Sequence, residues 1–205
     1  MTVEFSDVDY PRLAKFGVST IYEAYERKGL IDLDLIQIIP GTKVAGPART
    51  VLLGRGGNRA VHKVMKELEP GEILVIASVV PEPIALIGEL LAVQARNSGV
   101  VGILVDGAVR DVDALRQLGL PIWARWIRAH GPGKSEESSI EAEVSIGGTV
   151  ICPGDAIVLD ADGGVVIAKD DVALVLEAAE GRDEREKHIQ DRLRKGEYTF
   201  DIYAL

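Results

Sequence analysis

The stretch that decides the fold is residues 88–111, GELLAVQARNSGVVGILVDGAVRD. Its first part consists mainly of good helix formers and ends at Asn97-Ser98-Gly99, a typical stop signal for a helix. Residues 100–105 then form an almost unbroken apolar run that is rich in β-branched side chains. Such a run is typical of a strand buried on both faces, as in a parallel sheet. The stretch therefore predicts a helix, a glycine break and a central strand of an α/β fold.

The end of this strand carries the first candidate chemistry. Asp106-Gly107 predicts a tight turn, and Arg110 and Asp111 follow directly. Ligands of open α/β sheets bind beyond the carboxyl ends of strands, so both side chains are expected at a binding site. Asp111 could bind a hard divalent cation such as Mg²⁺, and Arg110 could stabilise negative charge on a substrate oxygen. A structural interpretation is equally open. In it Asp106 lies in a turn, Arg110 forms an ion pair with an acid, and Asp111 is the N-cap of the helix at 112.

Two glutamates have structural and functional interpretations as well. The backbone amides at Gly88-Glu89 open a helix and could hold a substrate carboxylate, with Glu89 facing a metal or its waters. Alternatively, Glu89 only complements the helix dipole. Glu23 follows Thr20 at the spacing of a capping box, and spacing alone favours this structural role.

Composition limits the function classes. The 205 residues are 47% hydrophobic, enough for the core of one domain. A formal net charge of −9 and no basic stripe with interleaved aromatics argue against a nucleic-acid partner. No apolar run reaches membrane-spanning length and the first residues are charged, so we expect a cytoplasmic protein without a membrane partner. Cys152 is the single cysteine, which excludes a disulfide framework.

Other catalytic chemistries have less support. Lys169 follows the apolar run 163–168, where a Schiff-base lysine can occur, but the next two residues are aspartates that favour its protonated form. The three histidines are spread too widely for a ligand motif. Neither a dinucleotide-binding glycine motif, a Walker loop nor a nucleophile elbow is present. A metal-assisted reaction is therefore preferred.

The rest of the chain mixes helices and strands, which predicts an α/β class with a mixed sheet. Helices are expected at 8–29 with a break at Gly17, at 59–68, at 112–118, and from 171 to about 195 with an interruption at Gly181. Strands are expected at 35–39, 49–53, 120–127, 142–151 and 156–168, the last with a bend at 161–164.

Two further patterns concern turns and the end of the chain. EPGE at 69–72 and CPGD at 152–155 each place Pro-Gly and an acid before an apolar strand, which favours type II turns and reused local geometry. The later half of the last helix is charged on all sides, typical of a solvated or intersubunit arm. The apolar, aromatic tail 196–205 is expected to dock on its own or a neighbouring subunit.

Taken in order, GELLA (88–92), GVVGILVDGAVRD (99–111), PGD (153–155) and DADGGVVI (160–167) resemble the family named after regulator of ribonuclease activity A. Within it, the chain is most similar to the 4-hydroxy-4-methyl-2-oxoglutarate / 4-carboxy-4-hydroxy-2-oxoadipate aldolases. The segments STIYEAYERKGLI (19–31), GPGK (131–134) and RLRKGEYTFDIYAL (192–205) favour that branch. The resemblance covers essentially the whole chain. The core pattern from Gly102 to Asp111 is specific for the superfamily but does not separate enzymes from regulators.

The resemblance implies a single domain, 1–205, with a three-layer α/β/β/α fold (swivelling β/β/α-like), a mixed sheet and a C-terminal helical arm and tail at 171–205. It also implies assembly as homotrimers or homohexamers. Asp111 matches the aspartate that binds the divalent metal, Mg²⁺ or Mn²⁺. Arg110 matches the arginine that contacts the pyruvyl oxygen and stabilises the enolate.

Further residue roles follow from the same resemblance. Gly88, Glu89, Leu90 and Leu91 match the helix entry whose amides hold the pyruvate carboxylate, and Glu89 stands where those aldolases can carry aspartate. Glu23 matches a glutamate that holds the catalytic water. Glu186, or a nearby residue of the arm, aligns with a glutamate supplied by the adjacent subunit. Lys134 is a candidate for binding the distal carboxylate of the substrate.

The implied activity is that of a class II pyruvate aldolase that cleaves 4-hydroxy-2-oxo diacids, with accompanying oxaloacetate decarboxylation. The rival hypothesis is a non-catalytic protein that binds and inhibits a ribonuclease through an acidic surface, and the C-terminal extension argues against it. A third function attached to the family, menaquinone methylation, lacks an S-adenosylmethionine-type glycine loop here.

Overall fold

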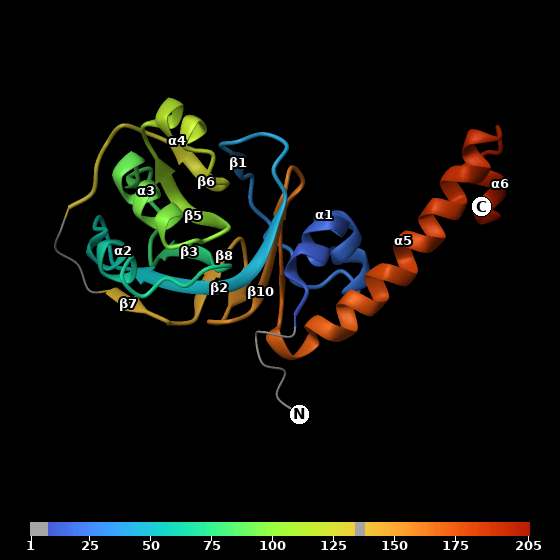
Figure 1. The fold of residues 1–205 in the computed structure, drawn as a ribbon, viewed down its shortest axis with the longest axis horizontal. Helices are drawn as coiled ribbons and strands as arrows, with labels where there is room; N and C mark the ends of the chain where they lie inside the picture. Colours follow the sequence, from blue (N-terminus) through green and yellow to red (C-terminus); the bar gives the residue numbers. More distant parts are fainter. Residues whose placement is uncertain (1–7, 134–137) are drawn as a thin grey trace.

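The computed structural model describes residues 8–133 and 138–205 (Figure 1). Its helices are α1 Tyr10–Ala24, α2 Arg59–Val64, α3 Glu89–Asn97, α4 Val112–Leu118, α5 Val172–Arg194 and α6 Thr199–Tyr203, with a 3₁₀ turn at Lys169–Asp171. Its strands are β1 Ile36–Gln37, β2 Val44–Leu53, β3 Ile73–Ser78, β4 Ala85–Ile87, β5 Gly102–Val109, β6 Ile122–Ile127, β7 Ser138–Ile140, β8 Val144–Ile146, β9 Thr149–Ile151, β10 Ala156–Asp160 and β11 Gly163–Ile167.

The central strands form a parallel sheet, as the sequence predicts. The strand order is β1-β6-β5-β3-β2-β10-β11, and the neighbours from β2 to β6 are parallel. Every residue of β5 is buried, which is why its sequence is an apolar run rather than an alternation. Antiparallel pairing of β10 with β2 and of β1 with β6 makes the sheet mixed.

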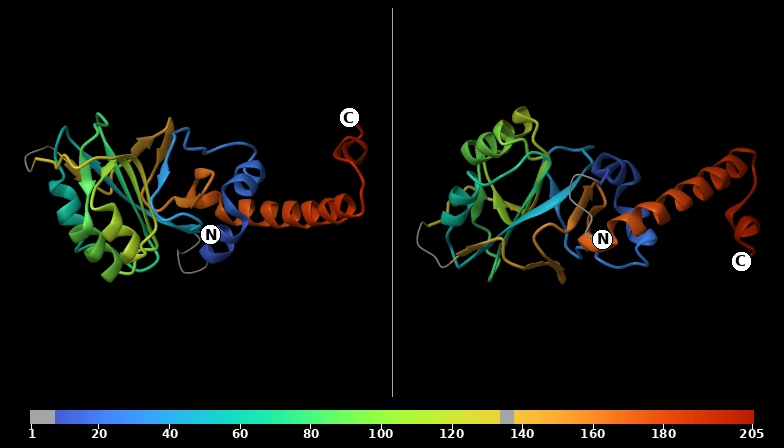
Figure 2. Two further views of the ribbon diagram at one scale, coloured as in Figure 1. Left: turned by 90° about the horizontal axis from the view of Figure 1, so that it is seen from above. Right: turned by 60° about the horizontal axis from the view of Figure 1, so that its bottom comes forward.

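Alternating side chains along the strands build three cores. The layers of helices and strands that enclose them are seen in Figures 1 and 2. Leu74 and Ile76 of β3 point to the core under α2, α3 and α4, while Ile73 and Val75 point to a second core shared with β8–β10. A third core lies between β10–β11 and helices α1 and α5. The order α/β/β/α and the mixed sheet agree with the predicted fold class.

The predicted turn at Asp106-Gly107 is wrong, because β5 continues through both residues to Val109. Asp106 is buried and its carboxylate accepts a hydrogen bond from Arg125 at 3.0 Å. A Cβ atom on Gly107 would lie 2.6 Å from Leu86, so this glycine permits close packing rather than a turn. The pairing of β5 with β6 shifts register between Val105 and Ala108. The chain therefore has a local irregularity within the strand here, and not the predicted turn.

The kink in α1 confirms the predicted break at Gly17, which has φ +79°. The amide of Val18, which begins the second part of the helix, donates to the buried Asp160 carboxylate at 3.0 Å. Thr20 therefore lies inside this helix rather than at its start. The capping box expected for Glu23 is wrong, and this glutamate instead pairs with Arg27 one turn further on.

The two Pro-Gly turns have the predicted shared geometry. Gly71 and Gly154 have φ +89° and +86°, as a type II turn requires. In each, the following acid folds back: Glu72 accepts from the Glu69 amide at 2.9 Å and Asp155 from the Cys152 amide at 2.8 Å. The fold brings both turns beside β2, although they lie far apart in the sequence.

The C-terminal helix projects from the rest of the protein (Figures 1 and 2). Its buried residues are confined to its first turns, Val172, Val175 and Ala179, and these pack toward α1. The interruption predicted at Gly181 is absent, because α5 is continuous to Arg194. The aromatic residues of the tail, including Phe200, are exposed on this chain. None of the helices in the described ranges combines the length and apolar composition needed to cross a membrane.

Several strand predictions differ from the structure. The strand expected at 49–53 begins at Val44 as β2, and β4 was not predicted. The single strand expected at 142–151 is a hairpin of β8 and β9, which reverses at Gly147 and Gly148, where φ is positive. The short strand β7 was not predicted, since its three residues follow a polar loop and pair at the edge of β2.

Candidate functional site

A cavity of about 230 Å³ lies where β4 and β5 end and α3 begins. Six residues singled out from the sequence line it: Gly88, Glu89, Leu90, Leu91, Arg110 and Asp111. β5 delivers Arg110 and Asp111 to this edge, and the Arg110 amide is fixed by a 3.0 Å hydrogen bond to the Ile87 carbonyl. The fold therefore brings the arginine, the aspartate and the helix entry into one cavity.

Arg110 and Asp111 face each other without closing a tight ion pair. Arg110 Nε lies 3.7 Å from Asp111 Oδ2, and the two side chains are 47% and 46% exposed. The same Oδ2 accepts a hydrogen bond from the Glu89 amide at 3.1 Å. Asp111 adopts the left-handed conformation, φ 58° and ψ 39°, which aspartate tolerates better than most residues.

Gly88 is needed for the approach of these side chains to α3. A Cβ atom at this position would lie 2.6 Å from Asp111 Oδ2 and 3.1 Å from Arg110 Nε. The backbone of Gly88 is extended, with φ −139°, so the requirement is one of space rather than of backbone conformation. This glycine therefore holds the start of α3 against the arginine–aspartate pair.

The amino end of α3 can accept an anion. Gly88 provides no side-chain cap, and the first amide of the helix is used by Asp111. The next amides, of Leu90 and Leu91, belong to the unsatisfied first turn of a nine-residue helix and line the cavity. Backbone amides and the helix dipole together bind carboxylates, so this end suits the acid group of a small substrate.

The donor set fits a hard divalent cation that keeps most of its waters. Within the described residues, Asp111 Oδ1 has no hydrogen-bond partner, and Glu89 lines the same cavity. No group of three or more acidic, histidine or cysteine side chains that could hold a metal is present in the described ranges. Mg²⁺ is typically bound by one or two carboxylates plus waters and substrate oxygens, whereas zinc requires a fuller set of protein ligands.

The structure leaves two other predicted site residues, Glu23 and Glu186, outside this cavity. Glu23 lies on α1, which packs on the side of β10 away from α3 (Figures 1 and 2). Glu186 lies on the projecting helix α5, where it pairs with Arg182 at 2.8 Å. Within one chain neither glutamate lines the cavity. Lys134 lies outside the described residues.

Five lining residues were missed from the sequence: Asn58, His62, Ala85, Leu86 and Pro132. Asn58 is buried and its side-chain amide donates to the Leu86 carbonyl at 3.0 Å, joining the loop before α2 to β4. His62 reaches the cavity from α2. The available signal was helical spacing, since the residues of α2 that face outward recur at intervals of three and four.

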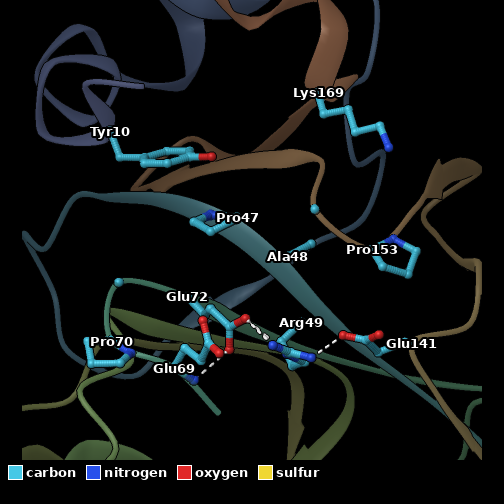
Figure 3. A pocket seen from close by; sticks show the side chains of 12 residues that line it. Tyr10, Pro47, Ala48, Arg49, Glu69, Pro70, Glu72, Glu141, Pro153 and Lys169 are labelled. Carbon is cyan, nitrogen blue, oxygen red and sulfur yellow. Dashed lines mark hydrogen bonds and ion pairs between the residues drawn. The ribbon is translucent and has the colours of Figure 1, made fainter. Parts of the chain in front are cut away.

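A second, larger cavity of about 540 Å³ lies between the two Pro-Gly turns (Figure 3). On one wall Arg49 donates to Glu72 Oε1 from Nε at 2.9 Å and from Nη2 at 2.7 Å, and Nη1 bonds Glu141. The hydrogen bonds to Glu72, more than the charge of either acid, raise the pKa of Arg49. Lys169 lines the opposite wall and does not line the cavity of Arg110.

Comparison with known proteins places this geometry in a family. A family model described as RraA-like, Aldolase/RraA, matches residues 18–166. The chain belongs to the RraA-like family. A relative from Halalkalibacterium halodurans, named "Putative 4-hydroxy-4-methyl-2-oxoglutarate aldolase", is 38% identical over 163 residues, which cover 80% of this chain and 75% of the relative.

Solved structures share the RraA-like fold. Streptomyces coelicolor RraAS2, described as an unusual member of the RNase ES inhibitor RraA protein family, has a TM-score of 0.80 at 26% identity, covering 89% of this chain and 96% of its own. An uncharacterized protein from Pseudomonas syringae pv. tomato has a TM-score of 0.83 at 20% identity, covering 97% and 95%. The predicted family resemblance is thereby confirmed, and the choice between aldolase and regulator depends on the site.

Proposed function

We propose that this protein is a divalent-metal-dependent class II pyruvate aldolase with oxaloacetate decarboxylase activity. Its substrates are 4-hydroxy-2-oxo diacids, 4-hydroxy-4-methyl-2-oxoglutarate or 4-carboxy-4-hydroxy-2-oxoadipate, which yield pyruvate and a second 2-oxo acid. The observation that carries the proposal is the placement of Arg110, Asp111 and the open amino end of α3 around one cavity. The name of the Halalkalibacterium halodurans relative supports a lyase.

The residues of the cavity bind the pyruvyl end of the substrate. The amides of Leu90 and Leu91 hold the substrate carboxylate, and Arg110 donates to the 2-oxo group, where negative charge accumulates during cleavage. Arg110 suits this role because its guanidinium is half exposed and only loosely paired with Asp111. Asp111 would hold the cation, Mg²⁺ or Mn²⁺, which would supply Lewis-acid polarisation of a substrate carbonyl group.

Cleavage requires one proton to leave and one to return. A water held by carboxylates takes the proton of the 4-hydroxyl group, and the C3–C4 bonding electrons pass into the pyruvate enolate as the second carbonyl forms. Protonation at C3 then gives pyruvate. Oxaloacetate reaches the same enolate by losing CO₂, so Arg110 supports both reactions.

The carboxylates for this water come from more than one chain in our proposal. Glu89 lines the cavity, whereas Glu23 and Glu186 are placed elsewhere on the same chain. Because α5 is a continuous helix that projects from the body, Glu186 can reach an Arg110 cavity in a neighbouring copy more readily than its own. A homotrimer or homohexamer would complete the site in this way.

A coupled assay tests the proposal. Pyruvate release from oxaloacetate and from 4-hydroxy-4-methyl-2-oxoglutarate should require Mg²⁺ or Mn²⁺ and stop when a chelator is added. Asp111→Asn should abolish the metal-dependent release of pyruvate, whereas Asp113→Asn, at a side chain that is 95% exposed, should leave it intact. Release of pyruvate at an undiminished rate in chelator would contradict the proposal.

A ribonuclease regulator is the second candidate, favoured by the structural likeness to RraAS2 and its description as a member of an inhibitor family. It predicts inhibition of ribonuclease cleavage that is the same with and without a chelator, and no pyruvate release. Measuring both activities on one preparation separates the two candidates.

A further inference from the structure

A short segment of chain after β6, which we call the strap, passes beside the candidate site. It comprises residues 128–133 and leaves the sheet where the Arg128 amide donates to the Val109 carbonyl of β5 at 3.0 Å. Further along, the His130 carbonyl accepts a hydrogen bond from the Ala85 amide of β4 at 2.8 Å. These two bonds hold the strap at the ends of β4 and β5, where the candidate cavity lies.

The last residue of the strap is fixed to the loop before α2. The Gly133 amide donates to the Gly56 carbonyl at 2.7 Å, and Gly133 also forms an isolated parallel bridge with Gly57. Pro132, directly before it, lines the cavity. Backbone hydrogen bonds to three different segments therefore set the position of the strap.

Arg110 contacts two glycines that belong to different segments. A Cβ atom on Gly88, at the start of α3, would lie 3.1 Å from both Cγ and Nε of this arginine. A Cβ atom on Gly131, in the strap, would lie 3.0 Å from its Nη1. Both separations are shorter than ordinary van der Waals contact, so neither position leaves room for a methyl group beside the side chain.

We propose that Gly131 is a positioning residue for Arg110, because its lack of a side chain lets the strap approach Nη1 and set the direction of the guanidinium. The inference rests on the proposed function, in which Arg110 donates to the 2-oxo group. In the described part of the chain no close ion pair holds this guanidinium, since Nε lies 3.7 Å from Asp111 Oδ2. Backbone contacts from Gly88 and Gly131 supply the constraint instead, and a preorganised donor requires such a constraint.

The geometry predicts that a methyl group at position 131 affects catalysis more than folding. It would meet the end of a flexible side chain and not backbone, so Nη1 can move by a few tenths of an ångström to accommodate it. The melting temperature should therefore change little. Catalysis is more sensitive, because misplacing a catalytic group by about 1 Å can cost about 10²-fold in rate.

The kinetics of Gly131→Ala test the proposal. For pyruvate release from oxaloacetate, kcat should fall about tenfold and KM should stay nearly unchanged, because the displaced donor acts on charge that develops in the transition state. Gly133→Ala is the matched control in the same strap. Its Cβ atom would lie 3.3 Å from the Gly56 carbonyl oxygen and has no contact with Arg110, so it should retain the parent kinetics.

A double variant shows whether Gly131 acts through Arg110. Lysine has no atom equivalent to Nη1, so adding Gly131→Ala to Arg110→Lys should cost no further activity. A tenfold loss that persists in the Arg110→Lys background would overturn the proposal, as would parent kinetics in Gly131→Ala alone.

A binding measurement separates this inference from the proposed function. Oxalate is an unreactive, planar dianion that resembles the pyruvate enolate. In the presence of Mg²⁺ it should bind Gly131→Ala about tenfold more weakly than the parent, and Gly133→Ala as tightly as the parent. That result in a protein without lyase activity would retain the positioning role of Gly131 and reject the aldolase. Unchanged oxalate affinity in Gly131→Ala, in a protein that releases pyruvate, would retain the aldolase and overturn the inference.

Discussion

Two arginines of this protein meet carboxylates at two different cavities, and the contrast distinguishes a guanidinium whose donors are used by the protein from one that is open to a ligand. Arg49 gives three nitrogens to Glu72 and Glu141, and its side chain is 15% exposed (Figure 3). Arg110 lies 3.7 Å from one carboxylate oxygen and is 47% exposed. The first guanidinium has its hydrogen-bonding capacity used by the protein, whereas the second retains donors for a substrate.

The carboxylates show the same contrast. Glu72 is 11% exposed and binds both Arg49 and the backbone of its own turn, so both oxygens are used. Asp111 uses Oδ2 for the amide of Glu89, and Oδ1 has no partner among the described residues. Saturation of donors and acceptors, rather than the presence of an arginine beside an acid, therefore distinguishes the two pairs.

The largest effect is expected on catalysis when Arg110, the more exposed of the two arginines, is replaced. Arg110→Ala should lower kcat/KM for pyruvate release by about 10²–10³-fold, the usual loss for one preorganised donor to a developing oxyanion. The melting temperature should change little, because the side chain forms no close hydrogen bond to another residue in the described structure. Arg116→Ala on α4 is the control. Near-normal turnover by the Arg110 variant would contradict a catalytic role for this guanidinium.

The converse change tests the ion pair of Arg49 with Glu72. Arg49→Ala leaves Glu72 buried without its cation and should lower the free energy of unfolding by about 3 kcal/mol. Urea unfolding gives this value, and activity per folded molecule should remain. An Arg49 variant as stable as the parent would show that burial of this pair contributes little.

A smaller effect on catalysis should follow from filling the space beside Asp111. Gly88→Ala introduces a Cβ atom 2.6 Å from Asp111 Oδ2 and must displace the carboxylate. Activity should fall about tenfold, as for other changes that reorient a metal ligand. Gly181→Ala in α5, where the nearest atom is 3.5 Å away, serves as the control for the added methyl group.

The smallest effect is expected from the Pro-Gly turn at Gly71, which precedes Glu72 of the Arg49–Glu72 pair. Gly71 has φ +89°, and a Cβ atom there meets nothing within 4 Å, so Gly71→Ala measures backbone conformation alone. The free energy of unfolding should fall by about 1 kcal/mol. Gly71→Asn should cost less, because asparagine tolerates this conformation, and equal losses would contradict the type II assignment.

The sequence predicts that Arg110 and Asp111 lie together at the end of a strand, because they are adjacent and follow an apolar run. It cannot reveal the Arg49–Glu72–Glu141 group, whose members are 23 and 92 residues apart and meet only through the pairing of β2 with its neighbours. The same limit explains Asp106-Gly107, where local turn chemistry was outweighed by strand pairing and by packing against Leu86.

The breaks and caps of helices were also predicted correctly in some places and wrongly in others. Gly17 breaks α1 as predicted because φ +79° requires a glycine, whereas the cap of the following helix comes from Asp160, 142 residues away. The charged surface of α5 was interpreted correctly as solvated on this chain, but Gly181 does not interrupt it, since one glycine costs a long helix only about 1 kcal/mol.

The left-handed backbone of Asp111 also limits how this position can evolve. Residues that adopt φ near 58° at low cost are chiefly glycine, asparagine and aspartate, and an aspartate codon becomes either of the other two by one base change. A descendant could therefore lose the acidic group in a single mutation and keep an intact fold. A lineage that shares this backbone can thus hold both catalysts and proteins that use the same surface only for binding.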